Sequence, residues 1–415
     1  MSNTKEYDLI VIGGGASGLM SAGRAGERGL KTLLLEKNKN LGEKLKISGG
    51  GRCNITNAEM DPRVLLKAYG KAEPFLYSLF SQFGVKETFT FFESRGLPLI
   101  IENKKRAFPQ TEKAEDVLKV LEHYIKKGNV TVLKSSPVTK VHIEKDAITG
   151  VFVGKELHRA KNYILATGGI SHPETGSTGE GLQWLKELGH TVEEPTPTIV
   201  PLSTAEEWSK KIAGVSIPSM KITFFVEGKK AFAETGEILF THFGVSGPLI
   251  LNNAHKVADL LHSGAVTATI DICPKVDAGA LEKTILEVFD NNKNKSLKNV
   301  IKEFTQEGLA KGVLMLLSDT VDIEKKVHSI SKEERKAIAR TLKSLPLTIN
   351  GLMGFDRAVV ADGGVPLEEI DMKTMHSKKI SNLYITGDLL HINRPSGGFS
   401  LQLCWSSGYI AGDNV

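Results

Sequence analysis

A glycine-rich turn near the N-terminus is the feature that most constrains the fold of this chain. Residues 13–18 read GGGASG, with the spacing GxGxxG, between an apolar run at 7–12 and a run of small residues at 19–28. A second apolar run at 30–35 is followed by Glu36. Strand, helix and strand within about 30 residues form a βαβ unit, and its right-handed crossover makes the strands parallel. The expected fold class is α/β, with a Rossmann-like domain.

The residues of this turn suit a dinucleotide. Gly13 permits the tight turn, Gly15 lets the backbone approach a pyrophosphate, and Gly18 permits close packing of the helix on the strand. The N-terminus of that helix offers free N–H groups and a partial positive charge to the phosphates. Glu36 stands roughly 20 residues further on, where a carboxylate binds ribose hydroxyls and disfavours a 2′-phosphate. This motif alone does not separate NAD from FAD.

Two later strand ends favour FAD. Residues 166–169 (ATGG) and 383–388 (LYITGD) each end an apolar run. Asp388 is placed to accept a hydrogen bond from a ribityl hydroxyl, although an ordinary strand-to-turn ending is the alternative for this segment. The glycines at 397–398 open an expected helix at about 399–410, whose N-terminus would face the flavin pyrimidine.

The composition indicates the class of protein. The chain has 415 residues, enough for two or three domains, and 40% of them are hydrophobic and 24% charged, as in soluble globular proteins. The net charge of +5 is small and spread out, which argues against a nucleic-acid partner. No apolar run reaches the ~20 residues of a membrane span and no secretory signal is evident, so the expected location is cytoplasmic.

The order of elements predicts a nucleotide-binding domain with an insertion. Helices are expected at 61–83 and 112–127, a hairpin at 96–108, and strands at 129–133, 138–144 and 147–153. A proline-punctuated linker is expected at 195–201, short β-like runs from 202 to 272, and amphipathic helix from 278 to 342. Parallel-strand character returns at 358–360 and 383–386.

Further motifs carry a resemblance to a known family. Residues 48–57 read SGGGRCNITN, accompanied by TGSTG at 175–179, FTHFGVSGP at 240–248 and SGGFSLQ at 396–402. With the residues above, they resemble the bacterial flavoproteins known as aminoacetone-oxidase-like or BaiN-like NAD(P)/FAD-dependent oxidoreductases. The resemblance covers essentially the whole chain. Two positions depart from the family pattern, because His391 and Ser400 stand where an acidic residue and an asparagine are common.

The resemblance implies a Rossmann-like FAD-binding domain, of the type that binds two dinucleotides, split by an insertion. The expected boundaries are 1–192 and 346–415 for the FAD domain, 193–275 and 330–345 for a β-barrel-like domain, and 276–329 for a helical subdomain. The expected cofactor contacts are Gly13, Gly15, Ala16, Ser17, Gly18, Glu36, Lys37, Lys44, Gly50, Gly51, Arg52, Cys53, Asn54, Val138, Ala166, Thr167, Gly168, Gly387, Asp388, Gly397, Gly398, Phe399 and Gln402.

Several of these residues have two interpretations. Arg52 is a fixed positive charge that would stabilise a reduced, anionic flavin, or else a partner in an ordinary salt bridge. Lys44 either reaches the pyrophosphate or faces solvent. Cys53 is expected to be a small packed residue rather than a redox thiol. The segment 175–181 is either a second phosphate-cradling turn or a loop that positions the flavin or the substrate.

No catalytic residue stands out, and no metal-ligand spacing is present. The candidates are Arg52, together with His391 and Arg394 as contacts for a substrate anion, and His242 in the insertion. A lone histidine such as His242 is more often structural.

The function predicted from these residues is an FAD-dependent oxidoreductase that exchanges hydride with a small-molecule substrate. NAD(P)H is the expected donor; because no second GxGxxG follows a βαβ unit, it would approach the flavin transiently. The alternatives are an amine oxidase that uses oxygen, an RNA-associated flavoprotein, and a flavin-holding module without turnover. The sequence does not determine the substrate or the oligomeric state.

Overall fold

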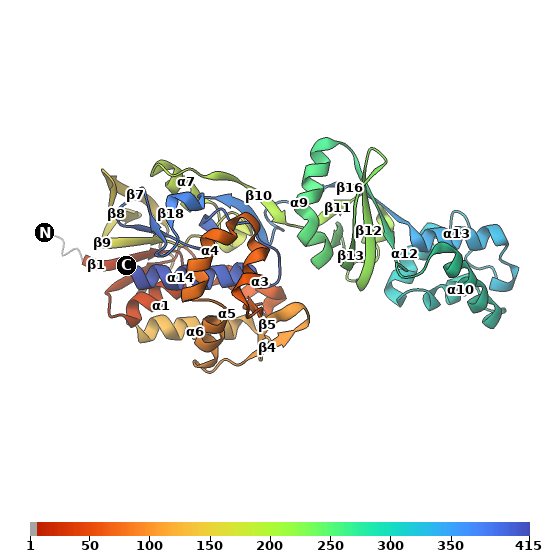
Figure 1. Cartoon of the computed structure of the whole chain (residues 1–415), viewed down its shortest axis with the longest axis horizontal. Helices are drawn as coiled ribbons and strands as arrows, with labels where there is room; N and C mark the ends of the chain where they lie inside the picture. Colours follow the sequence, from red (N-terminus) through yellow and green to blue (C-terminus); the bar gives the residue numbers. More distant parts are fainter. Residues whose placement is uncertain (1–5) are drawn as a thin grey trace. The chain divides into compact units, whose positions relative to one another are not determined.

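A computed structural model describes residues 6–415 of the chain (Figure 1). The chain divides into two compact units. Unit 1 comprises Met1–Pro197 and Val359–Val415, and unit 2 comprises Thr198–Ala358. Within the described residues, no helix is long and apolar enough to cross a membrane, and no group of three or more His, Cys, Asp or Glu side chains is placed to hold a metal ion.

Unit 1 is built on a mainly parallel sheet. Its strands are β1 (Glu6–Ile12), β2 (Thr32–Leu35), β6 (Thr131–Leu133), β7 (Val138–Glu144), β8 (Ala147–Val153), β9 (Glu156–Leu165), β18 (Ile370–Asp371), β19 (His376–Ser377) and β20 (Leu383–Ile385). Strands β20, β9, β1, β2 and β6 lie side by side in this order and pair in parallel. Strands β2 and β20 are buried at every position, as strands covered on both faces should be. The predicted βαβ unit is confirmed.

The helices of unit 1 are α1 (Ala16–Glu27), α2 (Glu43–Ile47), α3 (Pro62–Leu66), α4 (Glu73–Gln82), α5 (Val85–Glu93), α6 (Ala114–Lys127), α7 (Glu180–Glu187) and α14 (Phe399–Asn414). Short 3-10 turns lie at Ser48–Gly51, Lys67–Ala72, Asn103–Lys105, Pro173–Thr175, Leu367–Glu369 and Gly387–Leu389. The helix expected at 61–83 is interrupted, because Gly70 adopts a φ of +52° between α3 and α4. The hairpin expected at 96–108 is formed by β4 (Leu99–Glu102) and β5 (Arg106–Pro109), with β3 (Thr56–Asn57) beside β5.

Helices α1 and α14 pack parallel and unusually close (Figure 1). A Cβ atom on Gly408 would lie 2.4 Å from the carbonyl oxygen of Ser17, and one on Gly412 would lie 2.4 Å from that of Ser21. No side chain fits in either place, so the two glycines, one helical turn apart, set the spacing of the helices. This packing ties the C-terminal helix to the helix that follows the glycine-rich turn.

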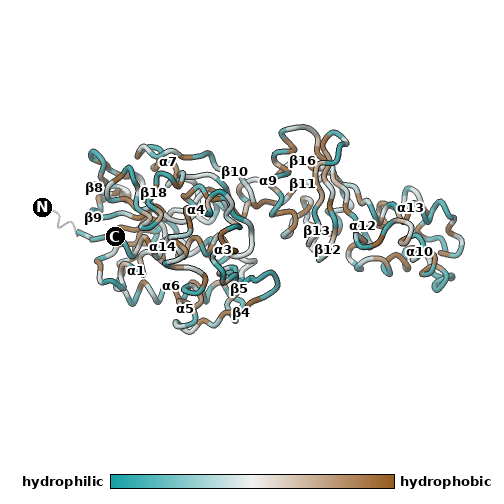
Figure 2. Tube along the Cα trace, in the orientation of Figure 1, coloured by the Kyte–Doolittle hydropathy of each residue, from teal (hydrophilic) through white to brown (hydrophobic). Residues whose placement is uncertain are grey.

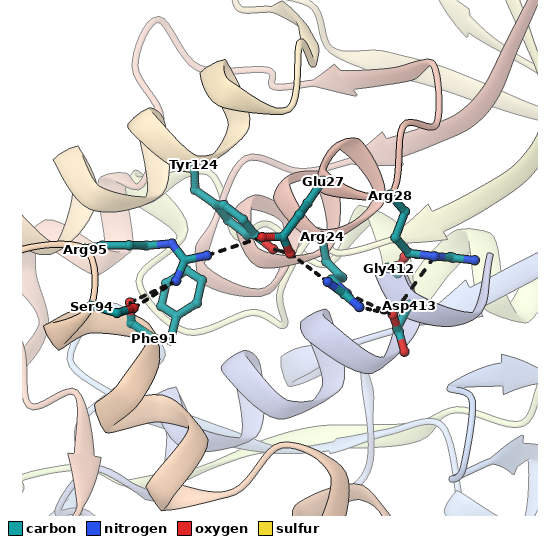
Figure 3. Close-up of polar contacts among 9 residues, drawn as sticks. All are labelled: Arg24, Glu27, Arg28, Phe91, Ser94, Arg95, Tyr124, Gly412 and Asp413. Carbon is teal, nitrogen blue, oxygen red and sulfur yellow. Dashed lines mark hydrogen bonds and ion pairs between the residues drawn. The ribbon is translucent and has the colours of Figure 1, made fainter.

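A polar network fastens the other end of this helix pair (Figure 3). Arg24 bridges Glu27 of its own helix and Asp413 of α14, at 2.7 Å in both cases. Glu27 also accepts a hydrogen bond from the Tyr124 hydroxyl of α6 at 2.8 Å and pairs with Arg95 at 3.6 Å. Arginine and the carboxylates thus join α1, α6 and α14 where their apolar contacts end.

Unit 2 contains a closed barrel. The strand order is β11 (Leu202–Thr204), β14 (Gly244–Ser246), β13 (Lys229–Thr241), β12 (Ser216–Val226), β15 (Val266–Asp271) and β16 (Leu345–Leu352). Buried Met220, Ile222 and Phe224 alternate with more exposed residues along β12, and Figure 2 shows both colours interleaved on this strand. The helices of unit 2 are α8 (Glu207–Lys210), α9 (Pro248–Ser263), α10 (Ala278–Asn291), α11 (Leu297–Val300), α12 (Glu307–Leu317) and α13 (Lys332–Lys343), with 3-10 turns at Ile301–Glu303 and Val327–Ser329.

The structure corrects three sequence expectations. The segment expected to be a linker does contain the boundary between the two units, after Pro197, but it is not irregular, because β10 (Glu193–Ile199) is a strand that pairs with β17 (Val360–Gly364). Strands of a two-stranded sheet have an open edge, where a residue without an N–H is tolerated. The pairing also places β17 outside the parallel sheet, where residues 358–360 were expected to continue it. Finally, α9 is a helix within a region predicted to hold only short strands.

Candidate cofactor site

The glycine-rich turn joins β1 to α1 with the geometry that its spacing predicts. Gly13 has a φ of +108°, and a Cβ atom on it would lie 2.5 Å from the carbonyl oxygen of Ala166. A Cβ on Gly18 would lie 1.9 Å from the carbonyl oxygen of Gly13. By contrast, a Cβ on Gly15 would meet nothing within 4 Å. Two of the glycines therefore permit close packing, and Gly15 borders open space.

That open space lies at the N-terminus of α1. Gly15 is the N-cap residue and provides no side-chain cap, and Ala16 and Ser17 begin the helix. The first N–H groups of a helix have no acceptor within the helix, and together they carry a partial positive charge. Room for a ligand and unsatisfied donors at one place fit a pyrophosphate, so the residues present suit the dinucleotide implied by the motif.

Glu36 lies at the end of β2, next to this turn. Its side chain accepts hydrogen bonds from the backbone N–H of Gly14 and of Asn38, both at 2.7 Å. The residue is 7% exposed, and burial raises the pKa of its carboxyl group despite these donors. Each carboxylate oxygen keeps a further acceptor position, so Glu36 suits the ribose contact expected of it.

The segment at 175–181 is bonded to the residues that follow Glu36. The ammonium of Lys37 lies 2.7 Å from both the Thr178 hydroxyl and the Glu180 carboxylate. The side-chain amide of Asn38 donates to the carbonyl oxygen of Thr175 at 2.9 Å. Lys37, predicted as a cofactor contact, is thus engaged in linking two loops beside Glu36.

A cluster of charges lies where β9 and β20 end. Asp388 binds Arg394 through one carboxylate oxygen, and the other lies 3.9 Å from the ammonium of Lys44. Lys44 also donates to the Ser171 hydroxyl at 3.3 Å. Gly168, at the strand end, has a φ of +73°, and a Cβ on it would lie at an ordinary contact distance of 3.7 Å from the same ammonium. Lys44 does not simply face solvent.

Lys44 is surrounded by protein and yet reachable. Burial lowers the pKa of its ammonium, and the neighbouring Asp388 carboxylate opposes this effect. Nevertheless, 28% of the side chain remains exposed. A partly exposed cation in such a place is suited to bind an anionic ligand. The ligand would compensate the charge of Lys44 as the Asp388 carboxylate does.

The SGGGRCNITN segment is an irregular turn that is anchored by Cys53 and Asn54. Gly49, Gly50 and Gly51 have φ values of +57°, +68° and +87°, and a Cβ on either Gly50 or Gly51 would meet nothing within 4 Å. Cys53 is fully buried, and burial raises the pKa of its thiol to about 12, which agrees with a packed residue. Asn54, with its amide turned to satisfy both of its groups, accepts from the N–H of Gly398 at 3.0 Å.

Arg52 forms the salt bridge that was its second interpretation. Its guanidinium pairs with Glu102 of β4 and lies 2.5 Å from Glu112. It also stacks over the ring of Phe108, 4.1 Å from the centroid. These carboxylates satisfy its charge, so Arg52 fastens the β4–β5 hairpin to the turn at 48–57. A free cation at this position is not what the structure contains.

The N-terminus of α14 is built by the two predicted glycines. Gly397 and Gly398 have φ values of +117° and +99°, and Gly398 is the N-cap residue. Gln402 accepts from the Thr56 hydroxyl at 2.6 Å, and the carbonyl oxygen of Phe399 accepts from the Tyr69 hydroxyl at 2.9 Å. The Thr56 bond joins α14 to the turn at 48–57, so the two glycine-rich segments lie together, and the Tyr69 bond joins α14 to the 3-10 turn Lys67–Ala72. Gly387 packs beside Ser17, and Val138 is buried at the start of β7.

The predicted catalytic candidates have different surroundings in the structure. Arg394 is 3% exposed and donates from all three nitrogens, to Asp388, to the Ser400 hydroxyl and to the carbonyl oxygen of Ile392. His391 lies 3.4 Å from Asp362 and is 39% exposed. His242 is an exposed residue of unit 2, in the turn between β13 and β14.

Sequence reasoning missed several polar residues of this region. Ser171 and Thr56 each bind a predicted contact, and His172 and Glu174 form a hydrogen-bonded pair next to Ser171. Tyr69 comes from a helical segment that carried no motif. A serine and a histidine directly after the ATGG strand end were the available signal, because loops at the carboxyl ends of parallel strands carry ligand contacts.

The sequence was compared with protein families and with characterised proteins. The family pattern described as "HI0933-like protein Rossmann domain" matches residues 7–414. The 3-dehydro-bile acid delta(4,6)-reductase of Clostridium scindens is 30% identical over 413 residues, which cover 97% of each chain. The ribosomal RNA dihydrouridine synthase of Escherichia coli is 29% identical, over 99% of this chain and 98% of that one.

Solved structures share the fold. The 3-ketosteroid-Δ4-(5α)-dehydrogenase of Rhodococcus jostii RHA1, in complex with 4-androstene-3,17-dione, superposes with a TM-score of 0.56 at 14% identity, over 100% of this chain and 98% of that one. A flavocytochrome c3 fumarate reductase gives 0.51 at 17% identity, over 100% and 78%. The resemblance predicted from residues 48–57 is confirmed by the family match. The chain therefore belongs to the HI0933-like flavoprotein family and is an FAD-dependent oxidoreductase of the reductase type.

Proposed function

We propose that this protein uses NAD(P)H to reduce a carbon–carbon double bond that is conjugated to a carbonyl group, with FAD as the resident carrier. The carrying observation is that relatives matching nearly the whole chain perform one chemical change on unlike molecules. A delta(4,6)-reductase of a 3-dehydro-bile acid and a dihydrouridine synthase both saturate such a bond. In the overall reaction, NAD(P)H and a proton convert the unsaturated compound into the saturated one, and NAD(P)+ is released.

The residues of the site divide the work of holding the cofactor. The open space at Gly15 and the N-terminus of α1 suit the pyrophosphate, and Glu36 suits the adenosine ribose. Asp388 is oriented by Arg394 for the ribityl chain, with Lys44 as the nearby cation. When bound, FAD supplies hydride transfer, and these groups place it.

The route of the electrons follows from the motifs. The sequence has one GxGxxG turn on a βαβ unit, at 13–18, and no second one for a resident nicotinamide. NAD(P)H and the unsaturated substrate would therefore use the same face of the flavin in turn, which predicts ping-pong kinetics.

The test separates the two half-reactions. The purified protein is loaded with FAD and mixed anaerobically with NADH or NADPH, while the flavin absorbance is followed. The reduced protein is then mixed with androst-4-ene-3,17-dione or with 2-cyclohexenone. Bleaching by a nicotinamide and recovery by an enone are expected. If neither nicotinamide bleaches the flavin while an amine does, and oxygen restores it, the protein is an oxidase and the proposal is wrong.

Two of the relatives support RNA as a second class of substrate. The ribosomal RNA dihydrouridine synthases of Escherichia coli and Haemophilus influenzae match 99% and 96% of this chain. The double bond would then be the one in the uracil ring, which is conjugated to a carbonyl. Ribosomal RNA from a strain lacking the gene is incubated with the enzyme and NAD(P)H, and its nucleosides are analysed by mass spectrometry. A gain of two mass units at a uridine identifies RNA as the substrate; no gain, with enone turnover, leaves the small molecule.

A further inference from the structure

Saturating a conjugated double bond requires a proton as well as a hydride. The hydride adds to the carbon β to the carbonyl, and the π electrons move to the carbonyl oxygen. The resulting enolate takes a proton at the α-carbon, and this completes the saturated product. A side chain positioned for that transfer accelerates it by roughly 10²–10⁴-fold, provided that its pKa lies near the working pH.

We propose that His172 supplies this proton and that Glu174 orients it; the inference rests on the function proposed above. His172 Nδ1 lies 2.7 Å from a carboxylate oxygen of Glu174. A carboxylate on one ring nitrogen stabilises the imidazolium and leaves the opposite Nε2–H to be donated. The backbone of His172 is left-handed, with a φ of +52°, a conformation that is costly for a residue other than glycine and that is frequent at functional sites.

The His172–Glu174 pair lies at the cofactor cluster. The preceding residue, Ser171, is bound by Lys44 at 3.3 Å, and Lys44 lies 3.9 Å from Asp388. Burial lowers the pKa of the Lys44 ammonium, and the charge of Glu174 is among those that oppose this effect, so the Glu174 carboxylate acts on Lys44. The charges around His172 are thus the Glu174 carboxylate and, beyond Ser171, the Lys44 and Asp388 groups. With 24% of its side chain exposed, His172 is sheltered and still accessible to a substrate.

Lys44 is assigned to the cofactor above, and the remaining proton-bearing groups near Asp388 are less suited than His172. Tyr69 donates its hydroxyl proton to the carbonyl oxygen of Phe399, and burial raises its pKa far above neutrality. Burial raises the pKa of the Cys404 thiol to about 12. His391, paired with Asp362, is the remaining imidazole beside the Asp388 turn, and it serves as the competing candidate in the test.

The test compares the half-reactions of the FAD-loaded wild type, H172Q and H391Q, with H142Q as the matched control. His142 lies on β7, where it bonds to the Thr149 hydroxyl at 2.7 Å. Reduction of the flavin by NAD(P)H should stay within about twofold of wild type in H172Q. Reoxidation by androst-4-ene-3,17-dione should slow at least about 100-fold. Reoxidation by ferricyanide, which needs no proton donor, should be unchanged.

Glu174 is a positioning residue and needs a different readout. E174Q removes the partner charge of the ring, while the amide oxygen still accepts from Nδ1–H, so the pH dependence of reoxidation by the enone should change and that of reduction by NAD(P)H should not. The pH profiles of the two half-reactions measure this.

Two outcomes overturn the inference while leaving the proposed function intact. In one, H172Q is reoxidised by the enone as fast as wild type and H142Q. In the other, H391Q shows the selective loss and H172Q does not. A wild type that ferricyanide reoxidises, but that neither an enone nor ribosomal RNA reoxidises, would instead refute the proposed function, and the proton donor with it.

Discussion

The guanidinium of Arg394 holds the carboxylate of Asp388 at the carboxyl end of the sheet. Both residues come from the segment between β20 and α14, and the arginine is also bonded to Ser400 at 3.0 Å and to the carbonyl oxygen of Ile392 at 2.6 Å. Arg394 is 3% exposed, whereas Asp388 keeps 18% of its side chain accessible. The buried cation therefore presents the accessible carboxylate, and we infer that Arg394 acts on the cofactor through Asp388.

Replacing Arg394 should weaken both the fold and the flavin site. R394M leaves Asp388 without its partner in a largely buried place, which is expected to lower the free energy of unfolding by about 3 kcal/mol. R394K keeps the charge but loses the fork, so an intermediate loss is expected. Melting temperature and FAD bound per chain measure the two effects. R159M, at an exposed arginine of β9, is the control. A variant R394M with wild-type melting and full flavin would contradict this role.

The two glycines at the start of α1 should respond differently to alanine. The extra methyl of G15A enters open space, so the apoprotein should melt as wild type does while FAD affinity falls at least about tenfold, because the methyl occupies the phosphate position. The methyl of G18A meets the carbonyl oxygen of Gly13 at 1.9 Å, so the backbone must shift and stability should fall by about 1–3 kcal/mol. Apoprotein melting and FAD titration distinguish the cases. Equal losses of stability would show that Gly15 is structural.

The Lys37–Glu180 pair should slow the release of FAD. It links the end of β2 to the start of α7 beside Glu36, and its members are 24% and 48% exposed. Exposed pairs contribute about 0.2–1 kcal/mol, so K37M or E180Q should raise the FAD dissociation rate by about 1.5- to 5-fold and more weakly at high salt. The dissociation rate is measured by adding an excess of a fluorescent flavin analogue and recording how fast it replaces the bound FAD. The control is K186M, which removes the exposed pair between Lys186 of α7 and Glu194 of β10 and should release FAD at the wild-type rate.

Stability should fall in acid because of a buried histidine and its carboxylate. His190 lies 2.7 Å from Glu369 and 2.8 Å from the Ser377 hydroxyl. Despite the opposing effect of burial, the Lys379, Thr191 and His190 donors together lower the pKa of Glu369 from 4.5 to about 2. This stabilisation is present above pH 4.5 and is lost as the pH falls toward 2. Burial lowers the pKa of His190, so unfolding also takes up a proton below about pH 6.5, and its effect has the same sign.

Melting of the apoprotein between pH 7 and pH 3 tests this. Discounted for partial solvent exposure, the Glu369 contribution is about 1–2 kcal/mol, or a few degrees. E369Q should melt lower at pH 7 and lose less on acidification than wild type does. E368Q, at the exposed neighbour, should follow the wild-type curve. Parallel curves for wild type and E369Q would refute the assignment.

Local patterns predicted much of unit 1. The strand–turn–helix–strand start, the hairpin of β4 and β5 and the glycine N-cap of α14 are where the sequence places them, because apolar periodicity and glycine act over a few residues. The prolines of β10 were misinterpreted, since a strand pairing across 160 residues leaves no local trace. Helix α9 was missed although its buried Leu249, Ile250 and Ala254 have the spacing of one helix face, because short β-like runs lie on both sides of it.

The sequence by itself predicted a βαβ unit with a dinucleotide-binding turn at Gly13–Gly18, and the SGGGRCNITN string indicated the family that the whole-chain match confirmed. Only the tertiary structure decided which charges are free. It paired Arg52 with Glu102, buried Arg394 behind Asp388 and bonded Lys44 to Ser171, the neighbour of His172. Backbone conformation follows from neighbours along the chain, but a charge is satisfied by whichever group the fold brings within a few ångströms.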